Sequence, residues 1–211
     1  MRIGIIGVGH LGGALAKVWA GKGHDILLGV RDTKKSHKYA KLLSLSKKIN
    51  LTTVYNAAQM SEVILLATPA HQARSVAKQV GRIHTKVVID ATNAVMFKPK
   101  PYAHATAALK ALTDCTHIVK CFNTTGHENL QNPKYGRDKL DMFMAGDSEY
   151  AKKIARQLAL DAGFGECHDF GGDAQIPLLE QFGMVWINLA IVQKQGANIG
   201  FKVLKRKDYH K

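Results

Sequence analysis

Short apolar runs alternate with helical stretches along the whole chain. The runs are rich in β-branched residues and end at Gly, Pro or Asn, which is typical of buried strands. They lie at residues 2–6, 25–30, 63–68, 86–92, 117–123 and 142–146, with weaker ones at 51–55 and 166–170. Because these runs show no polar alternation, we expect a parallel sheet that is covered on both faces.

The segments between the runs have helical spacing. Leu11, Leu15, Val18 and Trp19 mark one helix, which stops at Gly21. Further helices are expected in a Lys-rich stretch that ends near residue 46, near 104–113 and at 149–163. Strands and helices in alternation predict an α/β fold, a Rossmann-type doubly wound and mostly parallel sheet.

The last sixty residues have a different pattern. A long apolar segment at 176–192 opens with Pro177 near its first turn. This segment contains Glu180 and is shorter than a bilayer requires. We therefore expect a helix buried on several sides rather than a membrane span. We predict a nucleotide-binding domain at 1–147 and a small helical lobe at 148–211, on the substrate side and available for dimer formation.

The charge of the chain is strongly positive, at +14 from 30 basic and 16 acidic residues. Such a field attracts nucleic acid, acidic membranes or phosphorylated small molecules. The basic residues are scattered, with clusters at 34–41 and 202–207, and no zinc-finger or RNP pattern accompanies them. We therefore expect a solvated basic surface, with neither nucleic acid nor membrane as a partner.

Three cysteines occur, without a C-x-x-C pair, and no secretory leader is visible. This pattern favours reduced thiols and a cytoplasmic location. Cys115, His117 and Cys121 share one face of an expected strand, but a strand spreads them too far apart for a closed zinc site. We expect no metal, and no Ser–His–Asp arrangement or G-x-S-x-G motif is present.

Residues 7–12, GVGHLG, follow the first strand and open the first helix, as a dinucleotide-binding turn requires. Gly7 permits the tight turn, Gly9 lets the backbone approach a pyrophosphate, and Gly12 allows close packing of helix on strand. The free amides near His10 and Leu11 then face the anion at a helix amino terminus. His10 is expected to lie in the loop without a catalytic role.

The end of the second strand selects the cofactor. NAD enzymes place an acid there to hold the ribose 2′-hydroxyl, whereas this chain has Arg31 there, with Lys34 and Lys35 behind it. A guanidinium pairs with a 2′-phosphate and stacks on adenine, so the cluster favours NADP, used as NADPH. Asp32 keeps NAD open if the register shifts by one residue.

Three further loops follow strands at the same edge of the sheet. We expect them to line the nicotinamide side and the second substrate, although Asn and Thr are also common turn residues. The positioning residues predicted in these loops are Thr68, Pro69, His71, Asn93, Asn123 and Thr124. We identify no catalytic acid or base among them.

Taken in order, GVGHLG, VILLATP, VVIDATNAV, VKCFNTTGHENLQNP and LLEQFGMVWINLAI resemble the NADPH-dependent deazaflavin (coenzyme F-420) reductase family. They are also similar to the oxidoreductase domain of six-transmembrane metalloreductases. The resemblance covers nearly the whole chain, and GVRD and FNTTG are its more specific marks.

The resemblance implies an NADP-binding Rossmann domain in a homodimer, with coenzyme F-420 or a flavin as the small-molecule redox acceptor. Hydride transfer between two stacked rings needs positioning rather than a catalytic acid. Two alternatives stay open: an imine or hydroxy-acid reductase of the same fold, and a non-catalytic NADP-binding redox sensor.

Overall fold

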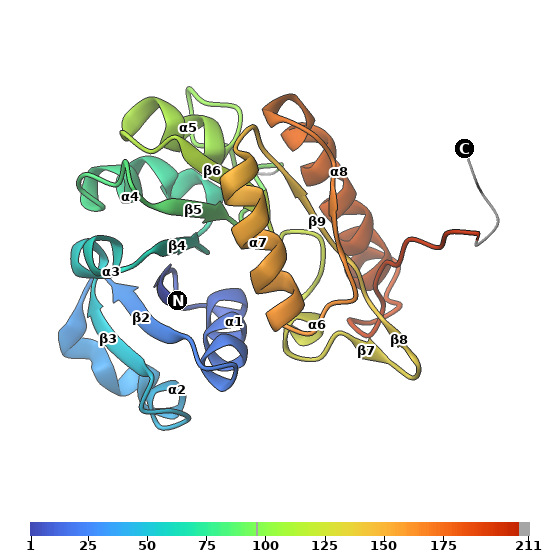
Figure 1. Ribbon diagram of the computed structural model, residues 1–211, viewed down its shortest axis with the longest axis horizontal. Coiled ribbons are helices and arrows are strands. Elements are labelled where there is room, and N and C mark those ends of the chain that lie inside the picture. The colour runs from blue at the N-terminus through green and yellow to red at the C-terminus, as the bar shows by residue number, and fades with distance from the viewer. Residues whose placement is uncertain (96, 207–211) are drawn as a thin grey trace.

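One eight-stranded sheet forms the centre of the computed structural model, which describes residues 1–95 and 97–206 (Figure 1). Its strand order is β10-β9-β6-β5-β4-β1-β2-β3. The strands are β1 (Arg2–Ile6), β2 (Asp25–Val30), β3 (Ile49–Thr53), β4 (Val63–Leu66), β5 (Val87–Asp90), β6 (His117–Cys121), β9 (Met142–Ala145) and β10 (Cys167–Asp169). The first six run parallel, and β9 pairs antiparallel with β6, which confirms the mostly parallel Rossmann-type sheet.

Helices follow most strands and cover both faces of the sheet. The helices are α1 (His10–Gly21), α2 (Ala40–Leu43), α3 (Val54–Met60), α4 (Ala73–Gln79), α5 (Ala105–Leu112), α6 (His127–Gln131), α7 (Glu149–Asp161) and α8 (Ile176–Ile187). Short 3-10 turns lie at Thr33–Tyr39, Ala70–Gln72 and Asp173–Gln175, and a two-stranded hairpin joins β7 (Lys134–Tyr135) to β8 (Asp138–Lys139).

The two faces of the sheet separate because successive side chains of a strand point in opposite directions. Ile3 and Ile5 of β1 pack in one cluster with α1 and α7, whereas Ile6 packs in a second cluster with α3, α4 and α5. Figure 1 shows α7 lying across the sheet on the first of these faces. Strands that are buried on both sides explain the continuous apolar runs of the sequence.

The sheet continues beyond residue 147. β10 pairs with β9, and Ala151 and Ala155 of α7 belong to the same core cluster as β1. The predicted domain division at 147 and 148 therefore does not coincide with an edge of the sheet. The described residues 170–206, which include α8, add no strand to the sheet.

Helix α8 is buried on one side only, so the expectation of a helix buried on several sides is wrong for the single chain. Leu179 and Glu180 are buried, but Leu178 is 57% and Val185 46% exposed. Val192, in the π-helical turn Asn188–Val192 that follows α8, is 62% exposed. The helical segment Asp173–Val192 is long and apolar enough to span a membrane by length and composition alone. Its buried face against the sheet gives it a structural role within the fold.

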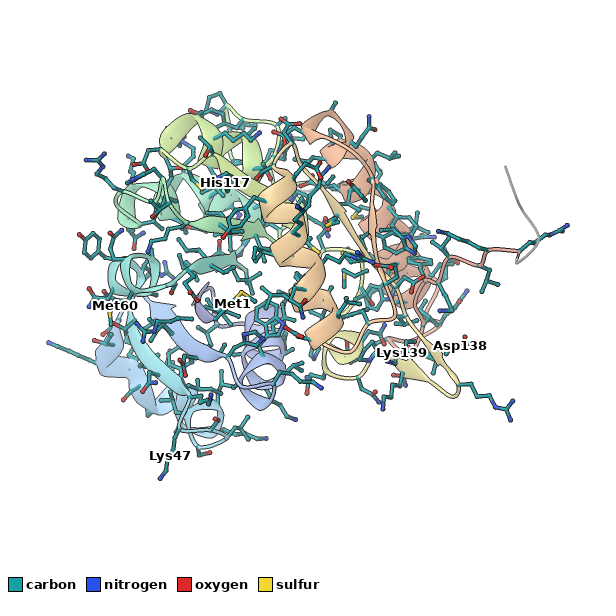
Figure 2. The ribbon with its side chains drawn as sticks, in the orientation of Figure 1. Met1, Lys47, Met60, His117, Asp138 and Lys139 are labelled. Atoms are coloured by element: carbon teal, nitrogen blue, oxygen red, sulfur yellow. The ribbon has the colours of Figure 1, made fainter. Side chains whose placement is uncertain are left out.

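Basic side chains are spread over the molecule. Lys47 lies beside α2 at one edge, and Lys139 lies on the β7–β8 hairpin at the opposite edge (Figure 2). This distribution agrees with a solvated basic surface.

Candidate functional site

A cavity of about 260 Å³ lies at the carboxyl ends of β1, β2 and β4. In open α/β sheets this edge is where ligands bind. The residues that line it are Ile6, Gly7, Val8, Gly9, Gly29, Val30, Arg31, Tyr39, Val54, Ala67, Thr68, Pro69, Gln72, Ser75, Val76 and Gln79. Gly7, Gly9, Arg31, Thr68 and Pro69 were all predicted as site residues, and the structure brings them together here.

The three glycines of the turn meet three different requirements. Gly7 has φ +102°, and a Cβ there would lie 2.5 Å from the Ala67 carbonyl. A Cβ on Gly12 would overlap the Gly7 carbonyl oxygen, so only glycine lets α1 approach β1 this closely. A Cβ on Gly9 would meet no protein atom within 4 Å, although Gly9 lines the cavity. The space at Gly9 is therefore left for a ligand.

The amino end of α1 supplies the electrostatic attraction. Gly9 is its N-cap residue, no side chain caps it in the described structure, and its first turn holds no acid. The amides of His10 and Leu11 therefore keep their capacity to donate, at the positive end of the helix dipole. This arrangement fits a pyrophosphate.

The side chain of Asp32 is already engaged. Its Oδ1 accepts a hydrogen bond from the Lys34 amide at 3.0 Å, and its Oδ2 lies 3.4 Å from Lys35 Nζ. Asp32 thus caps the 3-10 turn that begins at Thr33. A carboxylate held in this way is poorly placed for a ribose 2′-hydroxyl, so the structure favours Arg31 as the group that faces the cofactor.

Arg31 lines both this cavity and a second one beside it, of about 250 Å³. Asp32 and Lys35 line only the second cavity, and Lys34 lines neither in the described structure. The structure therefore places Lys35 beside Arg31 but does not bring Lys34 to the cavity wall.

Tyr39, Gln72, Ser75 and Gln79 line the cavity but are absent from the sequence prediction. They lie on the 3-10 turn after β2 and on the turn and helix after β4. A tyrosine in a Lys-rich stretch and three polar residues on short helices carry no motif. The only available signal was their position shortly after the ends of two neighbouring strands.

The loop after β4 divides its residues between the cavity and the solvent. Thr68 and Pro69 line the cavity, and the Thr68 hydroxyl is buried with no hydrogen-bond partner in the described residues. His71 is exposed instead, with its ring edge-on to Phe97 at 6.1 Å.

Asn93 and Asn123 form a reciprocal pair that joins two loops. Asn93 Nδ2 donates to the Asn123 backbone carbonyl at 2.8 Å, and Asn123 Nδ2 donates to Asn93 Oδ1 at 2.9 Å. Phe122 precedes the second loop with φ +65°, an uncommon conformation for a bulky residue. Burial of its ring against Trp19, at 5.4 Å, holds this turn in place.

Helix α8 packs directly on these two loops. Asn123 Nδ2 lies 3.4 Å from the Leu179 carbonyl oxygen. A Cβ on Gly183 would lie 2.6 Å from the Asn123 carbonyl oxygen and 3.0 Å from Asn93 Nδ2. Glycine at 183 therefore permits the close contact between α8 and the loops.

Among the described residues, Asn93 and Asn123 do not line the cavity, and the predicted residues Thr124 and His10 lie apart from both. The Thr124 hydroxyl is buried against Met142 Sδ at 3.7 Å, away from the Asn93–Asn123 pair. His10 is exposed, with its ring 4.8 Å from that of His127 at the start of α6. Neither residue lines the cavity in the described structure.

A buried lysine on β6 was missed by the sequence prediction. Lys120 is fully buried, and its Nζ donates to the Thr92 carbonyl at 2.7 Å. The same Nζ lies 2.8 Å from Asp90 Oδ2 and 2.9 Å from Glu180 Oε1. Burial raises the pKa of Asp90, but the Lys120 charge and several hydrogen bonds outweigh this and hold that pKa below its usual value.

The described residues hold no group of three His, Cys, Asp or Glu side chains placed to bind a metal. The three cysteines are free and buried. Cys121 and Cys167 lie with their sulfurs 3.9 Å apart, and burial raises the pKa of Cys121 well above its ordinary value. These thiols are part of the core.

Comparison with known proteins gives a family model and a curated relative that point to the same activity. Residues 2–94 match the family model for NADP oxidoreductase, coenzyme F420-dependent, which confirms the resemblance seen in the sequence. The chain is 26% identical to the F420-dependent NADP reductase of Methanothermobacter thermautotrophicus over 221 aligned positions, which cover 96% of this chain and 94% of that protein.

Solved structures share the fold. A protein of Arthrobacter sp. FB24, provisionally assigned as an F420-dependent NADP-reductase, superposes with a TM-score of 0.85 at 22% identity, covering 97% of this chain and all of that one. An imine reductase of Streptomyces aurantiacus superposes with a TM-score of 0.69 at 17% identity, covering 92% of this chain and 64% of that one.

Proposed function

We propose, from the match of residues 2–94 to the family model for coenzyme F420-dependent NADP oxidoreductases, an enzyme that transfers hydride between NADPH and a deazaflavin or related flavin. The match to an F420-dependent NADP reductase over 96% of the chain supports the same activity. NADPH supplies the hydride when it is bound, and the protein supplies the binding surface.

One observation carries the choice of NADP over NAD. Arg31 faces the cavity while the neighbouring Asp32 is held by the Lys34 amide and by Lys35. The amino end of α1 and the open space at Gly9 receive the diphosphate, and Arg31 pairs with the 2′-phosphate.

The nicotinamide side is assigned to Thr68, Pro69, Asn93 and Asn123. None of these four side chains titrates near neutral pH, which suits a reaction where hydride passes between two rings and the protein mainly positions them. Asn93 and Asn123 pack against Leu179 and Gly183 of α8, which supports this side of the site.

A panel of acceptors tests this activity. Purified protein with NADPH is expected to reduce a deazaflavin faster than FMN, and a cyclic imine slowest of all. The imine reductase fold makes the imine the relevant rival. Faster turnover of the imine would replace the proposal with an imine reductase, and tight NADPH binding without turnover of any acceptor would indicate a redox sensor.

We also propose that the enzyme is a homodimer joined through α8. The exposed face of α8 carries Leu178, Gln181 and Val185, which are spaced three and four residues apart as in a helix-pairing seam. Asn188 and Val192 extend the exposed surface into the π-helical turn Asn188–Val192 that follows α8. No charge interrupts the stripe on a chain with a net charge of +14, so a second copy meets no repulsion there.

Sedimentation velocity of the purified chain tests the dimer. The unaltered chain is expected to sediment as a dimer and Val185→Glu as a monomer. Leu204→Glu is the matched control, since Leu204 is 82% exposed but lies outside α8. A monomeric unaltered chain, or one that instead co-sediments with lipid vesicles, would contradict the proposed interface.

The three free thiols support a cytoplasmic location for this dimer.

A further inference from the structure

The charges buried around Lys120 do not balance. One ammonium faces the two carboxylates of Asp90 and Glu180, and all three side chains are at least 93% buried. The Lys120–Asp90 pair is already satisfied, because Asp90 also accepts hydrogen bonds from the Thr92 amide at 2.9 Å and the Thr106 hydroxyl at 2.8 Å. Glu180 adds a second buried negative charge, which is unfavourable for stability.

The bonding of Glu180 is also incomplete. Its Oε1 lies 2.9 Å from Lys120 Nζ, yet no hydrogen bond to it is formed within the described residues. A carboxylate retained at a buried position with partial compensation is poorly explained by stability.

The position of Glu180 links three parts of the site. Lys120 Nζ holds the Thr92 carbonyl at 2.7 Å, in the loop that carries Asn93. On the same face of α8, Leu179 and Gly183 contact Asn123 and Asn93. Glu180 therefore attaches α8, through Lys120, to the loop that holds Thr92 and Asn93. Its neighbours Leu179 and Gly183 attach the same face of α8 to Asn123 in the other loop.

We propose that Glu180 is a positioning residue, which holds α8 and the loops 91–95 and 122–126 in the arrangement needed for hydride transfer to the acceptor. It acts through Lys120 and touches neither cofactor nor acceptor. The expected fall in turnover number rests on the proposed function. The expected change in hydrogen exchange of the two loops does not, and it can be measured independently.

The test compares Glu180→Gln with Glu149→Gln. Glutamine keeps the size of the side chain and removes the charge. Glu149, whose side chain is 76% exposed, is the control because it is also the second carboxylate on a nearly buried lysine. Lys152 Nζ lies 3.1 Å from Glu149 and 2.8 Å from Asp169. The measurements are Tm, hydrogen exchange of residues 91–95 and 122–126, the Kd for NADPH and the turnover number with a deazaflavin.

For Glu180→Gln we expect an unchanged or raised Tm and faster hydrogen exchange in the two loops. The turnover number should fall about ten- to hundredfold, with the Kd for NADPH changed less than twofold. Glu149→Gln should change neither loop exchange nor turnover.

Two results would overturn the inference: a lower Tm with unchanged loop exchange, which indicates a purely structural residue, or equal effects of the two substitutions. If the unaltered enzyme reduces no deazaflavin, the proposed function fails, and the exchange measurement alone decides whether Glu180 positions the loops.

Discussion

Replacement of Arg31 by alanine separates NADPH from NADH. A hydrogen bond to a charged group contributes about 1.5–3 kcal/mol, and Arg31 is exposed to solvent, so we take the lower part of this range, about 1.5–2 kcal/mol. At about 1.4 kcal/mol per tenfold, the Kd for NADPH should rise about ten- to thirtyfold. NADH lacks the 2′-phosphate, so its Kd should change less than about threefold if Arg31 adds only weak stacking on adenine.

Isothermal titration calorimetry of both nucleotides measures this difference. Lys47→Ala is the matched control, because it removes the same charge from an exposed position before β3, at the opposite edge of the parallel sheet from Arg31 (Figure 2). The control should leave both affinities nearly unchanged. Equal losses of NADPH and NADH affinity in Arg31→Ala would refute the assignment of Arg31 to the 2′-phosphate.

Three more predictions follow from contacts of single residues. Gly9→Ala should keep the Tm but weaken NADPH binding at least tenfold. Gly12→Ala should lower the Tm, because its Cβ would overlap the Gly7 carbonyl oxygen. An unchanged Tm in Gly12→Ala would contradict the close packing of α1 on β1. Lys120→Met should reduce the free energy of unfolding by about 3–5 kcal/mol in a denaturant titration, because it leaves two buried carboxylates without a counter-charge. A loss below about 1 kcal/mol would contradict the stabilising role of Lys120. The Arg156 side chain and the Cys167 amide lower the pKa of Glu166 to about 2. Above pH 4.5 this half-exposed carboxylate therefore stabilises the fold by less than about 1 kcal/mol. This contribution is lost as the pH falls toward 2. Arg156→Ala should flatten that part of the stability profile, and an unaltered profile would exclude the pair as its source.

Local sequence patterns were sufficient to predict most of the sheet. Buried parallel strands need apolar side chains on both faces, so β1, β2, β4, β5 and β6 are visible as continuous runs. The reversal of β9 relative to β6 is not visible, because strand direction depends on the path of the connecting chain. The short helices α3 and α4, of seven residues each, were also missed, since they span only two turns.

Sequence reasoning found the site residues that combine two signals, a position directly after a strand and a residue type suited to phosphate binding. Gly7, Gly9 and Arg31 follow strand ends and have residue types that phosphate binding requires. Lys120 was missed because a lysine within a strand ordinarily reaches solvent, and its burial depends on Asp90 and Glu180, which are distant in sequence.

Thr124 shows a different limit of sequence reasoning. It neighbours Asn123, yet the two side chains have different partners, Leu179 for Asn123 and Met142 for Thr124. Only the structure shows which of the two faces Asn93. The exposed stripe on α8 was not predicted either. Composition alone does not distinguish a helix buried on all sides from one that is buried on one side only.

Transfer of deuterium from NADPH that carries deuterium at both C4 positions of the nicotinamide tests the central claim most directly. The purified chain is mixed with the labelled nucleotide and an equal amount of oxidised deazaflavin, and the reduced product is analysed by mass spectrometry. The account predicts reduction that depends on the protein, with deuterium retained in the reduced deazaflavin because hydride passes directly between the two rings. A reduced product without deuterium, or no reduction at all, would contradict it.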